Sequence, residues 1–581
     1  MPDMSFPARF LALALLILAP LALAGQSLTP AVARRIDALF ADQNKPHVPG
    51  CALGVMRNGA LAYGRGYGWA DLERDVPITT ATLFDIGSTS KQFAAASIAL
   101  LVAEHRLSYA DDVRKYIPEL PDYRVVGAAG ALGTPITIDN LMRHTSGLRD
   151  YTGLLVLAGH TLEEATTDSQ ALARIVRQRH LNFPTGSKFE YSNTGYFLLS
   201  VIVQRVTGMP LADFAHERIF LPLGMTHTRY RNHAAMLIPN RALGYAPDDS
   251  GGFRNSMSNW EQTGDGAVQL SIDDAAKWDE NYYHPRVGGA EMVRAMQTRG
   301  TLANGDSITY ARGLFIDHYR GLHRVQHGGD WVGYHAAYSR FPDQHTSVMI
   351  LCNSDGISPT ELADKVSDIV LATSFTEKGP PSVAAAGGEK RAASDGAKAL
   401  DASRLTGSYY ALSNDEVVRI VKKDTALVLE FVGRAMPLHA TAPATYAVSG
   451  LPVTVEFVAE GEAPAHAVRL FVASELRGEA ERFTAEAPDA ATLRQFAGSY
   501  YSPELGVTWP MIVKNDSLVL ANEGSELVDI SGALAPAMKD AFTAGGGVIR
   551  FTRDASGSVT GYELSASRMR GIRFEREKPN L

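Results

Sequence analysis

Residues 84–93 read Phe-Asp-Ile-Gly-Ser-Thr-Ser-Lys-Gln-Phe, and this stretch lies where a strand pattern gives way to a helical one. Ser88 and Lys91 are three residues apart, so in the first turn of a helix they share one face. The unpaired backbone N–H of a serine there supplies half of an oxyanion hole. A buried lysine near other cations can act as a base toward the serine hydroxyl. Taken alone, the pair is more often a helix-capping serine beside a surface lysine.

Two later stretches supply the other groups that a serine nucleophile needs. Tyr191-Ser-Asn193 lies between a turn and a helical pattern. There Tyr191 can relay a proton to the leaving group, and Asn193 can hold a substrate carbonyl. The two glycines of His327-Gly328-Gly329 let a substrate backbone lie along an edge strand. The backbone N–H of Asp330 is then a second oxyanion donor, although a lone His-Gly-Gly is ordinarily a packed loop.

In this order, the three motifs resemble those of the serine β-lactamase and penicillin-binding-protein superfamily. The closer likeness is to its class C β-lactamase, D-alanyl-D-alanine carboxypeptidase and D-aminopeptidase branch. The resemblance covers roughly residues 30–375. It is supported by four further stretches: Leu107-Ser-Tyr-Ala-Asp-Asp-Val-Arg-Lys-Tyr-Ile-Pro118, Leu141-Met-Arg-His-Thr-Ser-Gly-Leu148, Pro222-Leu-Gly-Met225 and Ser271-Ile-Asp-Asp274.

The resemblance implies a fold and a chemistry. The fold is an α/β catalytic domain of β-lactamase/transpeptidase type, with an antiparallel sheet flanked by helices and a helical subdomain. The chemistry is a covalent acyl-enzyme at Ser88, with base and acid work shared by Lys91 and Tyr191. The backbone N–H groups of Ser88 and Asp330 would hold the oxyanion, and Asn193, His327, Gly328 and Gly329 would bind the substrate.

The third motif departs from most β-lactamases and penicillin-binding proteins, which carry a lysine where this chain has His327. That lysine pairs with the substrate carboxylate, whereas a histidine is shorter and mostly neutral near pH 7. We therefore expect poor binding of carboxylate-bearing β-lactams and of terminal D-Ala-D-Ala. His-Gly-Gly resembles the D-aminopeptidases, whose catalytic domain is followed by two lipocalin-like barrels. Related esterases and archaeal peptidases also replace the lysine.

The patterns along the chain divide it into regions. Residues 27–375 begin with a hairpin pattern around Asn58-Gly59, continue with helical patterns and end with strand patterns at 336–341 and 346–351. This order predicts one sheet completed by both ends of the region, with a helical body. Residues 376–400 are rich in Ala, Gly, Pro and charge and lack large apolar side chains, so we predict a linker there.

Beyond the linker the chain repeats itself. Leu405-Thr-Gly-Ser-Tyr-Tyr410 returns as Phe496-Ala-Gly-Ser-Tyr-Tyr501, and short alternating apolar stretches follow both copies. Such stretches are typical of antiparallel barrels or sandwiches. We predict two all-β barrel domains, at 401–487 and 492–578, that shape access, bind or support.

The N-terminus predicts export. Arg9 precedes an apolar run at 10–23 that ends in Ala22-Leu23-Ala24, so we predict that residues 1–24 are a secretory signal peptide. The run is short for a membrane span, and no later segment is long and apolar enough for one. The net charge of −8 gives no reason to expect nucleic-acid binding. We expect a periplasmic or extracellular protein, and the sequence leaves homo-oligomer formation open.

The two cysteines open and close strand patterns. If those strands were antiparallel neighbours, Cys51 and Cys352 would lie close enough for a disulfide, and two buried free thiols are an equally good alternative. No His-Glu-x-x-His or clustered Cys/His spacing occurs, so neither a metal nor another cofactor is expected.

These observations favour an exported serine hydrolase that acts on amides, first of all a D-aminopeptidase-like peptidase. An esterase or a β-lactamase of the same superfamily is the alternative within enzymes. A non-catalytic protein that binds peptide or cell-wall ligands is the alternative of another class. The presence of Ser88, Lys91 and Tyr191 together argues against it, because a binding site has no need of all three.

Overall fold

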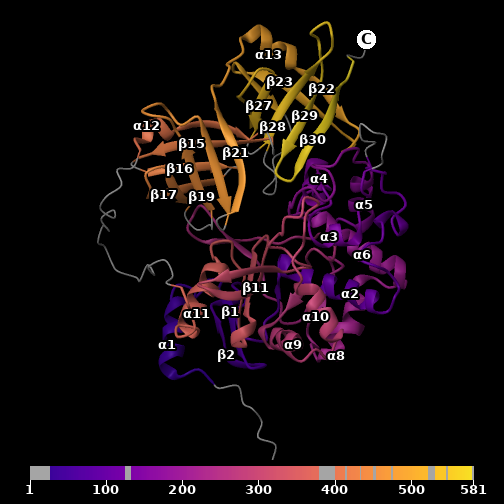
Figure 1. The fold of residues 1–581 in the computed structure, drawn as a ribbon, viewed down its shortest axis with the longest axis vertical. Helices are drawn as coiled ribbons and strands as arrows, with labels where there is room; N and C mark the ends of the chain where they lie inside the picture. Colours follow the sequence, from indigo (N-terminus) through magenta and orange to yellow (C-terminus); the bar gives the residue numbers. More distant parts are fainter. Residues whose placement is uncertain are drawn as a thin grey trace, which may run out of the picture.

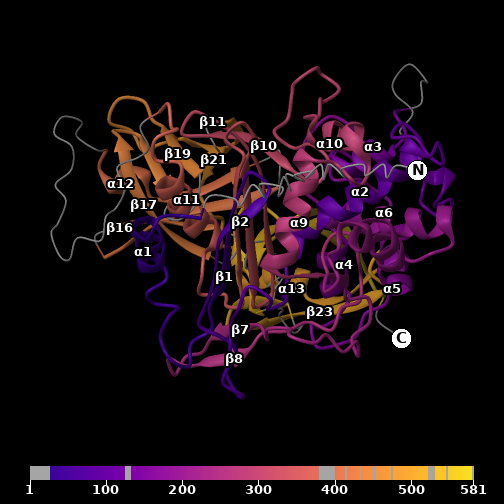
Figure 2. The same ribbon diagram turned by 90° about the horizontal axis from the view of Figure 1, so that it is seen from below.

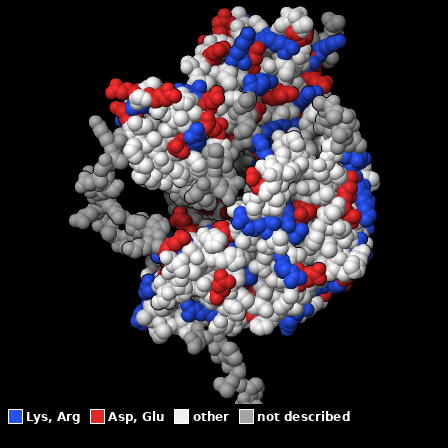
Figure 3. Space-filling model, in the orientation of Figure 1, with Lys and Arg blue, Asp and Glu red and all other residues white. Residues whose placement is uncertain are grey.

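The computed structural model describes residues 27–124, 133–377, 400–411, 415–424, 426–431, 434–448, 453–472, 475–520, 530, 532–544 and 547–578. The predicted signal peptide lies outside these residues, as does most of the predicted linker. The described chain forms a sheet-and-helix unit followed by two antiparallel β units (Figure 1). Basic and acidic side chains are interspersed on the face in Figure 3, in keeping with the formal charge of −8.

A six-stranded antiparallel sheet lies at the centre of the first unit, in the order β10-β11-β12-β13-β1-β2. Its strands are β1 (Cys51–Arg57), β2 (Ala60–Tyr67), β10 (Phe315–Tyr319), β11 (Leu322–Trp331), β12 (Tyr334–Phe341) and β13 (Thr346–Cys352). The β1–β2 turn is Asn58-Gly59, with φ of 47° and 77°, as a tight hairpin turn requires. β1 pairs with β13 along its whole length. The prediction of one sheet completed by both ends of the unit is therefore confirmed.

Helices cover both faces of this sheet. Side chains alternate along β1, so Leu53 and Val55 pack into a core with α1 (Pro30–Leu39) and α11 (Pro359–Val370), whereas Ala52 and Met56 enter the main core. On that second side α9 (Ile272–Tyr283) packs against β1, β2 and β13. Figure 2 shows α1 and α11 on one side of β1 and α9 on the other. With both faces covered, β1 and β13 are buried almost throughout.

The helical part of the unit is built around α2 (Lys91–Ala103), which is buried along almost its whole length. A helix that is apolar on all sides is a core helix. Around it lie α3 (Ile138–Met142), α4 (Tyr151–Leu157), α5 (Asp168–Val176), α6 (Asn193–Thr207), α7 (Leu211–Ala215), α8 (Leu221–Leu223) and α10 (Gly289–Gln297). Among the described residues no single helix has the length and apolarity to cross a membrane. Together, α6 and α7–α8 have that length and apolarity, but the pair is bent by 80°.

Smaller sheets complete the unit. A three-stranded one has the order β5-β9-β6 and leads directly into the turn that carries Ser88. The short strands are β3 (Trp69–Asp71), β4 (Val76–Pro77), β5 (Phe84–Asp85), β6 (Arg229–Tyr230), β7 (Tyr245–Pro247), β8 (Phe253–Asn255) and β9 (Val268–Leu270).

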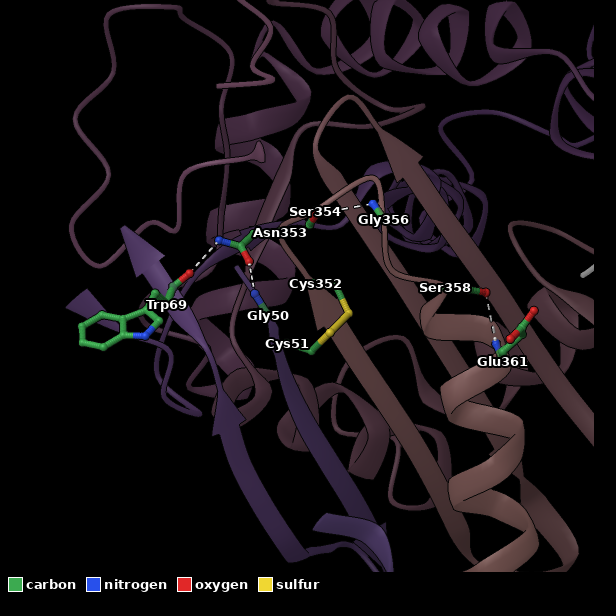
Figure 4. The surroundings of a disulfide bond; sticks show 9 residues. All are labelled: Gly50, Cys51, Trp69, Cys352, Asn353, Ser354, Gly356, Ser358 and Glu361. Atoms are coloured by element: carbon green, nitrogen blue, oxygen red, sulfur yellow. Dashed lines mark hydrogen bonds between the residues drawn. A yellow bond between two sulfur atoms is a disulfide. The ribbon is translucent and has the colours of Figure 1, made fainter. Parts of the chain in front are cut away.

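Cys51 and Cys352 form a disulfide (Figure 4). The two residues face each other in the β1–β13 register, and their Cα atoms are 4.1 Å apart. Next to the bond, the Asn353 side chain accepts a hydrogen bond from the Gly50 N–H and donates one to the Trp69 carbonyl. The disulfide and this amide therefore join the two ends of the first unit at one point.

The first β unit is a closed eight-stranded barrel, preceded by α12 (Ala402–Leu405). Its strands are β14 (Gly407–Ala411), β15 (Glu416–Lys423), β16 (Ala426–Phe431), β17 (Arg434–Ala442), β18 (Thr445–Val448), β19 (Val453–Val458), β20 (Ala467–Val472) and β21 (Glu475–Phe483). Tyr409 lies in its core, so the repeated Gly-Ser-Tyr-Tyr motif forms the first strand of the barrel.

The second β unit, preceded by α13 (Ala490–Phe496), is a nearly closed barrel. The edge strands of its nine-stranded sheet, β25 and β26, follow each other directly in sequence, so the sheet curls until its edges meet. The strands are β22 (Gly498–Ser502), β23 (Val507–Lys514), β24 (Ser517–Leu520), β25 (Gly532–Ala533), β26 (Ala535–Pro536), β27 (Ala541–Ala544), β28 (Gly547–Arg553), β29 (Val559–Ala566) and β30 (Met569–Arg576). The prediction of two all-β barrels is confirmed.

The last barrel is joined to the first unit by shared core and by a buried ion pair. Leu154 and Leu157 of α4 belong to the barrel's hydrophobic core. Arg149 lies 2.9 Å from Glu504, and both side chains are almost fully buried, with exposures of 1% and 3%. Contacts of this kind fix the barrel against the helices beside Ser88.

Candidate active site

Ser88 lies in a tight 3-10 turn, Gly87–Ser90, immediately before α2 begins at Lys91. The turn depends on Gly87, which has a φ of +47°. A Cβ at Gly87 would come within 2.8 Å of the Asp330 nitrogen on β11. Glycine is therefore required both by the backbone conformation and by the close approach of β11.

The Lys91 side chain is fully buried beside Ser88. Its Nζ lies 3.0 Å from Ser88 Oγ, 2.9 Å from Asn193 Oδ1 and 2.8 Å from the Asp265 carbonyl oxygen. Burial lowers the pKa of Lys91 to about 7. The carboxylate of Asp265 has the opposite, smaller effect on this pKa. The amine is therefore available in its neutral form near pH 7, within hydrogen-bonding distance of the serine hydroxyl.

Tyr191 lies two residues before α6, and Asn193 is the first residue of that helix. The Tyr191 ring centroid is 4.9 Å from Lys91 Nζ, and the His144 ring packs against Tyr191 with the ring centroids 4.1 Å apart. The Tyr191 hydroxyl is buried with no hydrogen-bond partner among the described residues. Burial raises its pKa well above the ordinary value, and a weaker interaction with Ser88 lowers it. Tyr191 therefore keeps its proton near pH 7.

His327 lies on β11, but its side chain is turned into the protein. The ring is buried, and its Nε2 is 2.9 Å from the Tyr310 hydroxyl. Burial and the nearby Lys91 lower the pKa of His327 to about 3, so the imidazole is neutral. The third motif thus offers backbone rather than a charged side chain to a substrate.

The expectation of an edge strand at the third motif holds for only half of β11. β10 pairs with β11 as far as Gln326, so the edge is free of β10 only from His327 onward. At Gly329 a Cβ would come within 2.0 Å of the Ile86 oxygen and 3.1 Å of the Ser88 nitrogen. This contact brings the backbone before Asp330 against the turn that carries Ser88, as two oxyanion donors require.

Asp330 and its neighbours fix the end of β11. The Asp330 carboxylate is 2.6 Å from His335 Nδ1, and the Asp355 carboxylate is 2.9 Å from His335 Nε2. Burial opposes protonation of His335, but the two carboxylates raise its pKa to about 9. His335 is therefore charged at neutral pH and joins β11 to the loop after β13.

Asp265, which follows Gly264 in the loop before β9, is an acidic residue beside Lys91 that the structure adds to the site. Its side chain is 9% exposed, its Oδ2 accepts a hydrogen bond of 3.1 Å from the Tyr151 hydroxyl, and its Oδ1 has no partner among the described residues. Burial raises the pKa of Asp265, whereas the charge of Lys91 lowers it. Asp265 and Lys91 therefore form a buried pair in which each charge favours the charged form of the other.

A hairpin of the last barrel reaches this site. Arg568, in the β29–β30 turn, lies 3.0 Å from Asp150 and 5.5 Å from the Tyr191 ring centroid. The backbone N–H of Asp150 in turn donates to the Arg568 carbonyl, and Asp150 Oδ2 accepts from the Asn193 N–H at 2.9 Å. Arg568 adds a positive charge that lowers the pKa of Lys91 further. Lys91 is thus influenced by a residue 477 positions later in the chain.

A pocket of about 680 Å³, open to solvent, lies beside Ser88. Asn193, Asp265 and Asp330 line it near the serine, and Trp260, Trp331 and Tyr334 contribute aromatic walls. The described residues contain no cluster of His, Cys, Asp and Glu that could hold a metal ion. The contact between Ser88 and Lys91, with Tyr191 beside the lysine, can support attack of the serine on a carbonyl carbon.

A family model described as Beta-lactamase matches residues 36–372, more than half of the 581-residue chain. The chain belongs to the beta-lactamase family. The resemblance carried by the three motifs is thereby confirmed. As a member of the beta-lactamase family the protein is a serine hydrolase.

Similarity to known proteins extends over most of the chain. Penicillin-binding protein 4* of Bacillus subtilis (strain 168) is 28% identical over 445 residues, which cover 73% of this chain and 93% of the relative. A D-aminopeptidase of Brucella anthropi is 25% identical over 547 residues, covering 91% and 96% of the two chains. The octameric penicillin-binding protein homologue from Pyrococcus abyssi, a solved structure, has a TM-score of 0.54 at 21% identity. It covers 77% of this chain and 99% of that one, and shows likeness of fold.

The beta-lactamase-family site combines residues that the sequence singled out with others that it did not. Ser88, Lys91 and Asn193 are in direct contact, and Tyr191 lies over the lysine. Sequence reasoning missed Asp265, His144 and Arg568. Gly264-Asp265-Gly266 and the quoted stretch that contains His144 were available as local signals. For Arg568 no local signal exists, because a turn arginine is ordinarily a surface residue.

Proposed function

We propose that this protein is an exported serine hydrolase that releases N-terminal D-amino acid residues from peptides or amides through an acyl-enzyme on Ser88. The observation that carries the proposal is the 3.0 Å contact between Ser88 Oγ and the fully buried Lys91 Nζ. The likeness to a D-aminopeptidase over 91% of the chain, both barrels included, supports the choice of substrate.

In the proposed mechanism neutral Lys91 takes the proton of Ser88, and Oγ attacks the carbonyl carbon of the scissile amide. The N–H groups of Ser88 and Asp330 stabilise the oxyanion. Tyr191, whose raised pKa keeps it protonated, donates to the leaving nitrogen, and Lys91 then returns a proton to Tyr191. The acyl group stays on Ser88 until water, deprotonated by Lys91, attacks the ester carbonyl. As the bond to Ser88 breaks and the acid leaves, Lys91 returns the proton to Ser88 Oγ.

The preference for a free amino terminus follows from the charge beside the serine. Asp265 Oδ1 has no hydrogen-bond partner among the described residues, and Asp265 lines the pocket next to Asn193. A substrate ammonium near Asp265 would compensate its charge. It would also lower the pKa of Lys91, because the carboxylate would no longer favour the protonated amine. A cationic substrate would thus help to produce its own base.

Export is supported by the N-terminal sequence pattern and by the Cys51–Cys352 disulfide, since disulfides persist mainly in oxidising compartments. Expression with residues 1–24 in a bacterial host tests it. The expected result is a mature chain in the periplasm or medium that begins at Gly25. An uncleaved cytoplasmic chain would contradict the export proposal.

The test of activity compares D-alanine p-nitroanilide with its L-form and with N-acetyl-D-alanine p-nitroanilide, using the mature chain and Ser88→Ala. We expect cleavage of the free D-form alone, and none by Ser88→Ala. That variant should melt like the wild type, because one hydroxyl at a pocket wall packs little. If a fluorophosphonate labels Ser88 but no anilide is cleaved, Ser88 is still supported as a nucleophile, and the aminopeptidase activity is refuted. Absence of both would refute the mechanism as well.

A further inference from the structure

The far part of the pocket beside Ser88 is built on the three-stranded sheet β5-β9-β6. Asp85 on β5 faces Gln269 on β9 in the sheet register, and the Arg231 N–H, just after β6, bonds to the Ala267 carbonyl. Arg241 joins the same floor through a backbone bridge to Leu83. Asp85, Gln269, Arg231 and Arg241 all line the pocket. One wall of the pocket therefore carries two permanent positive charges.

Arg231 is committed to structure. Its Nη1 donates to the Ser258 carbonyl at 3.0 Å, and its Nη2 donates to the Ala234 carbonyl at 3.2 Å and to Asn259 Oδ1 at 3.4 Å. The side chain is only 8% exposed. Its guanidinium is thus held by the loop that it supports and has few donors left for a ligand.

Arg241 differs from Arg231. Among the residues that the structure describes, its guanidinium makes no hydrogen bond, ion pair or contact over an aromatic ring, although the residue is half-buried. The acid nearest in the pocket floor, Asp85, is already bonded: Oδ1 accepts from the Gly87 N–H and Oδ2 from Gln269, both at 2.9 Å. Arg241 therefore has an electrostatic interaction with Asp85 but no hydrogen-bond partner among the described residues, and its planar guanidinium matches a carboxylate with two parallel hydrogen bonds.

The pocket lies on the acyl side of Ser88. Asp330 and Trp331 line it, whereas His327, Gly328 and Tyr191 do not. In the mechanism above Tyr191 protonates the leaving nitrogen, so the leaving group departs on the Tyr191 side and the acyl group occupies the pocket. The pocket extends from Ser88 to Arg241 and to the aromatic side chains of Trp260 and Trp331, so it has room for a side chain longer than an alanine methyl group.

We propose that Arg241 is a specificity-determining residue that binds a carboxylate on the acyl side chain of the substrate, so that the preferred substrates carry an acidic D-residue such as D-glutamate or D-aspartate. This inference rests on the proposed function for the identity of the acyl group. The aromatic walls of Trp260, Trp331 and Tyr334 hold the methylene part of the side chain. Arg241 at the floor selects the acid over the amide of the same shape.

The test compares D-glutamic acid α-(p-nitroanilide) with D-glutamine α-(p-nitroanilide), which differ only in charge, and the aspartate and asparagine pair likewise. The variants are Arg241→Gln, Arg241→Lys and, as a matched control, Arg229→Gln. Arg229 lies on β6 but does not line the pocket. We expect the wild type and Arg229→Gln to favour an acid over its amide in kcat/KM. Arg241→Gln should lower this ratio roughly 10- to 100-fold, and Arg241→Lys should give an intermediate ratio.

A second readout does not require turnover. Glutarate should quench the fluorescence of Trp260 and Trp331 in the wild type and in Arg229→Gln, with weaker quenching in Arg241→Gln, and glutaramide should have no effect. An acid-to-amide ratio that Arg241→Gln leaves unchanged would overturn the proposal, as would equal glutarate binding by all variants. If no anilide is cleaved, the proposed function fails, and glutarate binding alone still decides whether Arg241 is a carboxylate site. If Arg241→Gln does not fold, Arg241→Lys provides the same comparison.

Discussion

Removal of the Cys51–Cys352 disulfide should destabilise the first unit by an amount that its position determines. The bond joins residues 301 positions apart. In the chain-entropy description, closing a loop of this length removes about 19 cal/mol/K of conformational entropy from the unfolded chain. The unfolded state is thereby destabilised by about 5–6 kcal/mol at 25 °C. Both cysteines are fully buried between paired strands, so alanine fits without new polar burial. The double variant Cys51→Ala/Cys352→Ala should therefore fold and be much less stable.

Guanidinium unfolding followed by tryptophan fluorescence measures this effect. Of the five tryptophans, four lie in the first unit, and only Trp509 lies in a barrel, so the signal reports mainly on the sheet and helices. With an m-value on the order of 5 kcal/mol/M, the midpoint should fall by about 1 M. Trp509→Phe in both backgrounds removes the remaining barrel signal.

The wild type refolded under reducing conditions is the control, and it should unfold at the same midpoint as the double variant. A midpoint within about 0.2 M of the oxidised wild type would refute the reasoning. It would mean that β1 and β13 stay associated in the denatured chain, so that the disulfide restricts nothing.

Charge, pH and interface predictions follow from the site. Asp265→Asn removes a carboxylate that favours protonated Lys91, so the acid limb of the kcat/KM profile should move to lower pH by about one unit. Arg568→Gln removes a cation that disfavours protonated Lys91, so the same limb should move to higher pH. If neither variant moves the limb in pH–rate profiles, Lys91 is not the base. His335 has a folded pKa of about 9, so its stabilisation, on the order of 1–3 kcal/mol, is complete below pH 6.5 and is lost as pH rises through 9. Urea unfolding from pH 6 to 10 should show this slope in the wild type and lose it in His335→Gln. Glu504→Gln leaves a buried arginine without its carboxylate and should cost about 3–5 kcal/mol in urea unfolding, and an unchanged midpoint would show that the barrel is not held there.

The sequence was sufficient for the parts of the fold and site that depend on local pattern. Asn58-Gly59 predicts its hairpin, and Ser88-x-x-Lys91 predicts its contact, because both act over a few residues. The disulfide remained open at the sequence level, because it depends on strands 301 residues apart. Arg568 was missed for the same reason: its partner Asp150 is 418 residues earlier, and only the docking of the last barrel brings the two together.

The free edge of β11 and the role of Arg241 in the pocket also could not be predicted from the sequence. The free edge of β11 depends on where β10 stops, at Gln326, and β10 itself is too short to predict with useful boundaries. Arg241 suggests a carboxylate site only once the structure shows that Asp85, the acid in the pocket floor, is hydrogen-bonded to Gly87 and Gln269. Residue types alone do not say which charges have partners.

The position of β1 between β2 and β13 has a consequence for the chain while it is being made. β1 leaves the ribosome long before β13, and at about 5–20 residues per second an interval of 301 residues lasts roughly 15–60 s. During that interval the β1 edge that β13 will cover is open, with apolar side chains that are buried in the finished sheet. The half-made protein is thus more prone to aggregate than the finished one, and the arrival of seven residues, Thr346–Cys352, ends the exposure.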